Sequence, residues 1–301
     1  MALFIANAHI IAMDSLVEYL EEWIMQGLIE AVTNKFNNIL ESVNEQVGGV
    51  ATQVGQTPQG WNSGIFSMIK TLSETVVLPV AGMILTFVLC YELISMIIEK
   101  NNMQDFDTFN IYKWIFKTFV AAYILSNTFT MVMGVFELSQ TVVNGSVGII
   151  TSSLEINAAV SDLQAQLEAM TFFELIGLWL EMNILSICME ALAICIFVIV
   201  FGRMIEIYLV VSVAPIPLST MTNREWGTMG NNYLKSLFAI GFQGFLIMIC
   251  LAIYSVLIQN IGTADNVRSA IWSVAGYTVL LALLFSKQAD LQRIYFQRTS
   301  F

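Results

Sequence analysis

The chain has 301 residues, of which 57% are hydrophobic and only 12% are charged, and its mean hydropathy is +0.73. A soluble domain carries about a quarter charged residues, so this composition predicts an integral membrane protein. The net charge of −11 argues against a nucleic-acid-binding surface, because phosphate contacts need clustered Lys and Arg.

Few residues are suited to catalysis or metal binding. His9 is the single histidine, and the four cysteines lie in apolar runs without CxxC spacing. The sequence also lacks a phosphate-binding loop, an HExxH motif, a GxSxG motif and a dinucleotide fingerprint. We therefore expect no catalytic residue, no metal site, no cofactor and no enzymatic activity.

The first 64 residues predict an amphipathic arm followed by a linker. In residues 1–47, apolar side chains recur at helical spacing, while acidic side chains between Glu18 and Glu30 occupy another face. This helix is too polar to span a bilayer. It either packs on its own protein or serves as an interaction or oligomerisation arm. Residues 48–64 are rich in Gly, Thr and Gln, which is typical of a linker or turn.

Five apolar stretches reach the length of about 20 residues that a bilayer requires. They cover residues 75–98, 111–138, 175–202, 233–261 and 267–285. A sixth apolar segment, Ile205 to Met221, contains Pro215 and Pro217. Because each proline lacks an N–H and disfavours helix at the preceding residue, this segment either spans with a kink or enters the membrane and returns to the same side. A re-entrant segment needs neighbouring protein or a wet cavity around its broken backbone.

The positive charges favour the re-entrant alternative, since Lys and Arg of short loops prefer the cytoplasm. Six spans with both termini inside would place seven of these residues inside and five outside. Five spans place only Lys35, Lys70 and Arg268 outside. The nine inside are then Lys100, Lys113, Lys117, Arg203, Arg224, Lys235, Lys287, Arg293 and Arg298. The connection 139–173, which has no Lys or Arg, also falls outside in this arrangement.

The sequence therefore predicts an all-α integral membrane protein with about five transmembrane helices, a proline-broken re-entrant segment and an amphipathic N-terminal region. We expect it in the plasma membrane, with its N-terminus outside and its C-terminus in the cytoplasm. The predicted parts are an extracytoplasmic arm and linker (1–64), two transmembrane helices (65–138), an extracytoplasmic loop (139–173), a transmembrane bundle (174–286) with the re-entrant segment 203–232, and a basic cytoplasmic tail (287–301).

Four polar residues in or next to the predicted membrane segments are candidates for function or packing. Glu190 is near the middle of the third span, where an ionisable group is by default a functional candidate. The alternative is a buried hydrogen bond that fixes packing. Arg203 and Glu206 lie three residues apart on one helix face and could pair. Gln243, in the sequence GFQG, could hydrogen-bond across helices while the two glycines permit close approach.

Residues 213–245, VAPIPLSTMTNREWGTMGNNYLKSLFAIGFQGF, resemble the signature region of the TrbL-like family. This family is the polytopic membrane subunit of VirB-type type IV secretion and conjugation systems. The resemblance is to its versions on conjugative elements of Gram-positive bacteria. The signature and the predicted turn comprise Ala214, Pro215, Pro217, Trp226, Gly227, Gly230, Tyr233, Leu234 and Lys235, followed by Gln243 and Gly244.

The resemblance implies a scaffold and channel subunit at the base of a DNA-transfer machine. Its implied partners are the lipid bilayer, further copies of itself, secretion ATPases, a surface component and, transiently, the transferred DNA. The loop 139–173 would lie along the DNA path, but it has no positive charge, so an acidic wall that repels DNA fits better than a phosphate grip.

Two other functions stay open. One is a secondary transporter or ion-coupled carrier that uses Glu190, although carriers usually show inverted repeats and paired broken helices. The other is a small pore or membrane-anchoring accessory protein.

Overall fold

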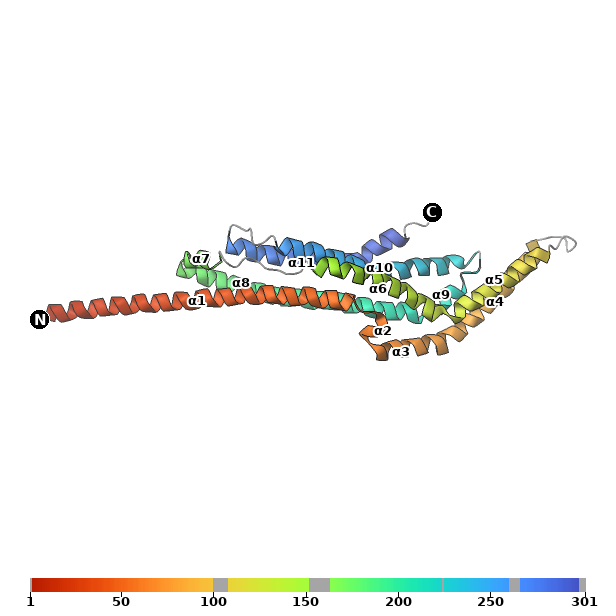
Figure 1. Cartoon of the computed structure of the whole chain (residues 1–301), viewed down its shortest axis with the longest axis horizontal. Helices are drawn as coiled ribbons and strands as arrows, with labels where there is room; N and C mark the ends of the chain where they lie inside the picture. Colours follow the sequence, from red (N-terminus) through yellow and green to blue (C-terminus); the bar gives the residue numbers. More distant parts are fainter. Residues whose placement is uncertain (1, 100–107, 152–162, 224, 260–265, 298–301) are drawn as a thin grey trace. The chain divides into compact units, whose positions relative to one another are not determined.

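The computed structural model describes residues 2–99, 108–151, 163–223, 225–259 and 266–297. Within these ranges every regular element is a helix and no strand occurs (Figure 1), which confirms the all-α prediction. The elements are α1 (Ala2–Val54), α2 (Pro58–Trp61), α3 (Ser63–Leu72), the π-helical turn η1 (Ser73–Val77), α4 (Leu78–Glu99), α5 (Thr108–Ser126), α6 (Thr128–Thr151), α7 (Leu163–Glu168), α8 (Phe172–Ser212), α9 (Pro215–Ser219), α10 (Gly227–Gln259) and α11 (Val267–Gln297).

The chain divides into two compact units. The first unit comprises Met1–Gly49, Thr151–Ile196 and Leu251–Leu283, and the second comprises Val50–Ile150, Phe197–Cys250 and Leu284–Phe301. The long helices α1, α8, α10 and α11 each contribute several residues to both units.

The described residues contain four helical segments that are long and apolar enough to cross a membrane. They are Ser63–Ile98, Phe172–Ser219, Gly227–Gln259 and Val267–Lys287. A fifth is present if the bent pair Phe109–Ser126 and Thr128–Gly145 counts as one span. The prediction of a multi-pass helical membrane protein is thereby confirmed. The apolar segment 205–221 is not a separate helix, because residues 205–212 belong to α8, and the rest comprises α9 with two residues on each side of it.

Helix α8 runs unbroken through Gly202 and Arg203, where the sequence analysis separates the third span from the next segment. Its 41 residues extend over about 60 Å, roughly twice the hydrocarbon core of a bilayer. The charge of Arg203 does not end the helix, because this side chain is buried in the second unit. The helix ends at Ser212, shortly before Pro215, as the missing N–H of proline requires.

The predicted second span is not one straight helix, because α5 and α6 meet at an angle of 68° around Asn127. The side-chain amide of Asn127 and the hydroxyl of Ser126 both donate hydrogen bonds to the carbonyl of Tyr123, at 2.9 and 3.0 Å. The hydroxyl of Thr128 donates to the carbonyl of Ile124 at 3.1 Å. Three consecutive polar side chains thus compete with the backbone for carbonyls, which bends or breaks helices.

The linker after α1 is shorter than the predicted range 48–64, because α1 continues to Val54. Two capped helix starts follow closely. The Thr57 hydroxyl accepts a hydrogen bond from the N–H of Gly60 at 3.1 Å, and the Asn62 side chain accepts one from Ile65 at 2.9 Å. Side-chain caps of this kind satisfy the free N–H groups of a helix start.

The predicted loop 139–173 is also partly helical. Helix α6 continues to Thr151, and α7 covers Leu163–Glu168. Residues 152–162 lie outside the described part of the chain.

The core of the first unit includes a stripe along the first half of α8. Its buried members, spaced by three or four residues as a helix face requires, are Leu175, Leu178, Met182, Leu185 and Met189. Polar contacts reinforce this unit: the hydroxyls of Tyr254 and Thr278 lie 2.8 Å apart, and Arg268 donates to the carboxylate of Glu181 at 3.0 Å.

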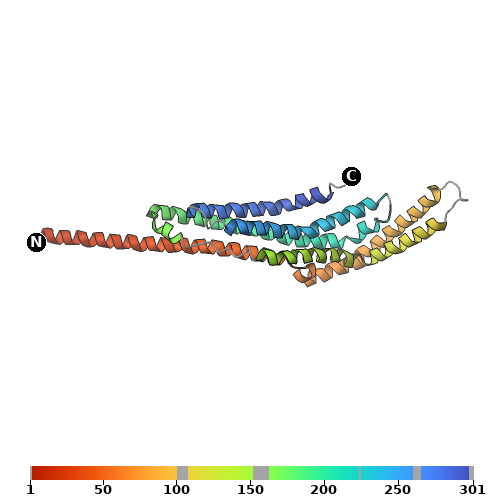
Figure 2. The ribbon, with the colours of Figure 1, turned by 45° about the horizontal axis from the view of Figure 1, so that its top comes forward.

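Two apolar clusters lie among the described residues of the second unit. One is formed by side chains of α3, α6, α8 and α10, and the other lies between α4 and α5, which run side by side in both views (Figures 1 and 2). The short helix α9 contributes to both clusters, since Leu218 packs in the first and Ile216 against the second. This position makes α9 the connection between the two parts of the second unit.

Candidate functional site

The residues between α8 and α10, 213–226, form a compact connection that we call the α9 turn. Ala214 is fully buried at the N-cap of α9, and Pro215 is its first residue. Proline suits this position, because the first N–H of a helix has no intrahelical partner. The chain leaves α9 at Ser219, and α10 begins at Gly227.

The chain reverses direction at the α9 turn. The phenol of Tyr233 on α10 donates a hydrogen bond to the carbonyl of Val210 on α8 at 3.1 Å. Further from the turn, Gly244 of α10 lies against the guanidinium of Arg203 on α8. Because these two contacts pair later residues of one helix with earlier residues of the other, α8 and α10 run antiparallel here.

Two glycines of the predicted signature allow α10 to start directly against α9. A Cβ atom on Gly230 would lie 2.1 Å from Cγ of Met221 and 2.6 Å from the carbonyl oxygen of Pro217. A Cβ atom on Gly227 would lie 3.1 Å from the carbonyl oxygen of Met221. Side chains cannot occupy this space, so glycine is required at position 230 by packing against backbone.

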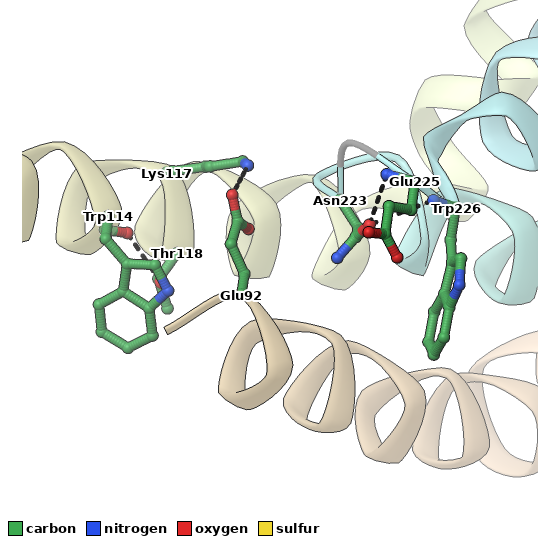
Figure 3. A network of polar contacts seen from close by, with 7 residues as sticks. All are labelled: Glu92, Trp114, Lys117, Thr118, Asn223, Glu225 and Trp226. Atoms are coloured by element: carbon green, nitrogen blue, oxygen red, sulfur yellow. Dashed lines mark hydrogen bonds and ion pairs between the residues drawn. The ribbon is translucent and has the colours of Figure 1, made fainter. Parts of the chain in front are cut away.

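An aromatic stack fastens the end of the α9 turn to α4. The ring of Trp226 stacks on Phe87 and Tyr91, with centroids 5.8 Å away in both cases and interplanar angles of 15° and 9°. The Tyr91 hydroxyl donates to the carboxylate of Glu225 at 3.2 Å. The side-chain oxygen of Asn223 accepts hydrogen bonds from the N–H groups of Glu225 and Trp226, at 2.7 and 3.1 Å (Figure 3).

An ion pair joins α4 to α5 next to this stack. The ammonium of Lys117 donates to one carboxylate oxygen of Glu92, and Trp114 lies nearby on α5 (Figure 3). The other oxygen of Glu92 and the indole N–H of Trp114 are buried without partners in the described structure. From the sequence, Lys117 is predicted only as one of the positive charges on the cytoplasmic side. The opposite charges of Glu92 and Lys117, which lie on two successive predicted spans, could have indicated this pair.

The predicted pair of Arg203 and Glu206 is not formed. Arg203 is 5% exposed, whereas Glu206 is exposed, and no salt bridge joins them. A Cβ atom on Gly244 would lie 2.7 Å from a terminal nitrogen of the Arg203 guanidinium. The side chain of Gln243 is also 5% exposed. Its Oε1 and the Nε of Arg203 are both buried without hydrogen-bond partners in the described residues.

The structure does not assemble all the predicted site residues. Glu190 belongs to the first unit and is exposed near the middle of α8, whereas the α9 turn belongs to the second unit. Lys235 is half-buried at the start of α10, and none of the ion pairs of the described residues includes it. The residues brought together are Ala214, Pro215, Pro217, Trp226, Gly227, Gly230 and Tyr233.

A small polar pocket lies where three helix irregularities meet. Its lining includes Ser73 of the π-helical turn η1, Asn127 at the α5–α6 break and Pro215 of α9. Ser73 is 1% exposed, and its hydroxyl has no partner in the part of the chain that is described. π-Turns often mark functional positions, and irregular backbone at membrane depth is tolerated where it lines a wet cavity. Of these three irregularities, only the proline is predicted from the sequence.

Within the described ranges, no group of three His, Cys, Asp or Glu side chains is placed to hold a metal ion. The four cysteines are free thiols.

A family model described as "TrbL/VirB6 plasmid conjugal transfer like protein" matches residues 43–215, more than half of the chain. The chain belongs to this family. Comparisons with curated proteins and with solved structures give no match. The protein is therefore a multi-pass membrane component of a conjugal transfer system.

The match confirms the family mostly from a part of the chain that precedes the resemblance, and the two ranges share only residues 213–215. It runs from the C-terminal part of α1 to Pro215 and so includes the bent α5–α6 pair and Arg203. It ends before Trp226, Gly227, Gly230 and Tyr233. Those four residues are candidates only because of their contacts in the α9 turn.

Proposed function

We propose that this protein is a scaffold and channel subunit of a conjugative type IV secretion system, and that it helps DNA or a protein–DNA substrate cross the cell membrane. Its family supports a role in conjugal transfer. The observation that carries the channel part of the proposal is the exposed position of Glu190 on α8.

Glu190 lies in an apolar stretch of α8, where nearby exposed side chains such as Ile187 and Ile194 suit lipid. An ionised carboxylate at the bilayer centre costs several kcal/mol, and such groups face other protein or water. Because none of the described residues of this chain covers Glu190, the proposal places a neighbouring copy or an aqueous path against it. A ring of copies around such a path would provide both.

The contact between Tyr91 and Glu225 supports the five-span arrangement. It joins the second half of α4 to the α9 turn, so the connection after α4 and the α9 turn belong on the same side of the membrane. The six-span alternative separates them. We accordingly propose a plasma-membrane protein with its N-terminus outside and its C-terminus in the cytoplasm. Its partners in this proposal are further copies and secretion ATPases, with DNA present only in transit.

Mating assays combined with cysteine labelling test this proposal. Deletion of the coding sequence should abolish plasmid transfer, and the intact protein should restore it. In a variant whose four cysteines are replaced by serine, Glu190→Cys should react with a membrane-impermeant maleimide or cross-link to a second copy. Purified protein should be oligomeric and should co-purify with a secretion ATPase, and Glu190→Gln should leave this assembly largely intact.

A matched control is available on the same helix. Cys188 is also exposed, but it lies roughly 160° around α8 from Glu190 at 3.6 residues per turn. A variant that retains only Cys188 should stay unlabelled if that face meets lipid. A monomer that transports a solute in liposomes, and that loses transport on Glu190→Gln, would contradict the proposal and favour the carrier.

A further inference from the structure

The N-terminal half of α1 carries an apolar stripe that the described structure leaves uncovered. Leu16 and Trp23 are 61% and 66% exposed, and Tyr19, Leu20 and Ile24 are exposed as well. The spacing of three and four residues places most of these side chains along one side of the helix. Clusters of exposed large apolar side chains mark interaction sites.

The same stripe is covered in the next part of α1. There the buried side chains at helical spacing are Val32, Phe36, Ile39, Leu40, Val43 and Val47. Leu28 and Ile29, which are half-buried, connect the two parts. The uncovered stripe therefore continues a face that already serves as a packing surface in the first unit.

The charges around the stripe exclude the bilayer as a suitable occupant. Glu18, Glu21 and Glu22 lie within the same turns and are exposed. Residues 1–34 contain five acidic residues and no Lys or Arg. Helices that lie on a membrane surface carry Lys and Arg on their polar face. No span candidate among the described residues falls in α1.

The same charges argue against a second copy of α1. Two such helices packed along this stripe would bring acidic flanks together in either direction, and like charges along a helix interface are repulsive. We propose that residues 16–31 dock an amphipathic helix of another protein, whose apolar stripe is flanked by Lys and Arg. This proposal stands apart from the channel function, because it rests only on the surface of α1.

Peptide binding to the full-length protein in phosphatidylcholine nanodiscs tests the proposal. The probes are two fluorescent helical peptides with the same Leu and Ile stripe, one flanked by Lys and Arg and the other by Glu. The basic peptide should bind at least tenfold more tightly than the acidic one. Leu16→Ser with Trp23→Ser should weaken its binding at least tenfold, and Glu18→Gln with Glu21→Gln and Glu22→Gln should remove the preference for it.

The control is Glu41→Gln with Glu45→Gln, since these two residues are exposed on α1 where its stripe is buried. This variant should bind the basic peptide as the unchanged protein does. Circular dichroism verifies that each variant keeps its helicity. If the variant with Leu16→Ser and Trp23→Ser loses helicity, the proposal is judged on the binding preference of the triple Gln variant. The proposal is overturned if the basic peptide does not bind, or if binding survives loss of the stripe. It is equally overturned if loss of the stripe abolishes self-association or binding to empty vesicles instead.

Discussion

The indole ring of Trp226 stacks on the phenol ring of Tyr91, with centroids 5.8 Å apart and an interplanar angle of 9°. Phe87 stacks on the same indole, and the Tyr91 hydroxyl donates to the neighbouring Glu225. The stack joins the end of the α9 turn to α4. Side-chain geometry thus couples the reversal between α8 and α10 to the α4–α5 hairpin.

Replacing Trp226 with Ala should release the α9 turn from α4. Each aromatic pair contributes about 0.5–1.5 kcal/mol beyond burial, so the loss of two pairs should cost about 1–3 kcal/mol. At roughly 2–4 °C per kcal/mol, the conversion for domains of about 150–250 residues, the unfolding temperature should fall by several degrees in a size-exclusion thermal assay in detergent. Trp226→Phe should keep about half of the stacking energy. If both variants lower the unfolding temperature equally, stacking is not the cause of the destabilisation.

Gly230→Ala should be among the most damaging small substitutions in the second unit. The new Cβ would meet the Pro217 carbonyl, which cannot move without shifting α9. Overpacking of this kind costs about 1–3 kcal/mol or more, so we expect a lower yield of folded protein and a lower unfolding temperature.

Gly134→Ala is the matched control for Gly230→Ala, because a Cβ there meets nothing within 4 Å. In a helix this change should stabilise by about 0.5–1 kcal/mol. Met221→Ala should not rescue Gly230→Ala, since it removes the side-chain clash but leaves the clash with the carbonyl. Full rescue would mean that the backbone contact is unimportant.

The five-span arrangement predicts which loops share a side of the membrane. In a background without native cysteines, Glu225→Cys should be labelled only from the cytoplasmic side. A cysteine at position 155, outside the described residues, should be labelled only from the external side. Labelling with impermeant maleimides on intact cells and inverted vesicles distinguishes the sides. Cytoplasmic labelling at position 155 would exclude the five-span arrangement.

The apolar helices could be predicted from sequence because hydropathy is a local property of about 20 successive residues. The end of α8 before Pro215 follows equally directly from the missing N–H of proline. The break at Asn127 could not be predicted in this way. The residues that flank it keep the mean hydropathy of the segment high, although three polar side chains there donate hydrogen bonds to carbonyls one turn back.

The contacts of the candidate site were less predictable, because they join residues far apart in the sequence. Nothing near Trp226 indicates that Phe87 and Tyr91 will meet it. The surroundings of Arg203 were hard to predict for a physical reason. A charge in an apolar run suggests a membrane boundary or a neighbour on the same helix, yet here the guanidinium lies against the glycine of another helix.

The contact between Arg203 and Gly244 can be tested by a double-mutant cycle. Gly244→Ala should destabilise by about 1–3 kcal/mol, because its Cβ would lie 2.7 Å from the buried guanidinium. Arg203→Met removes a buried charge without an ion-pair partner and should be neutral or stabilising. In the Arg203→Met background, Gly244→Ala should cost little, and the coupling energy is read from the unfolding temperatures of the four proteins.

A second cycle one turn away supplies the control. The Cβ of Gly241→Ala would lie 2.5 Å from the Ser139 hydroxyl oxygen on α6, so Ser139→Ala should rescue it. Arg203→Met should not rescue Gly241→Ala, and Ser139→Ala should not rescue Gly244→Ala. This crossed result is specific to two separate contacts of α10, one with α8 and one with α6. Rescue of both glycine variants by either partner would instead indicate general loosening of the second unit and would contradict the assigned contacts.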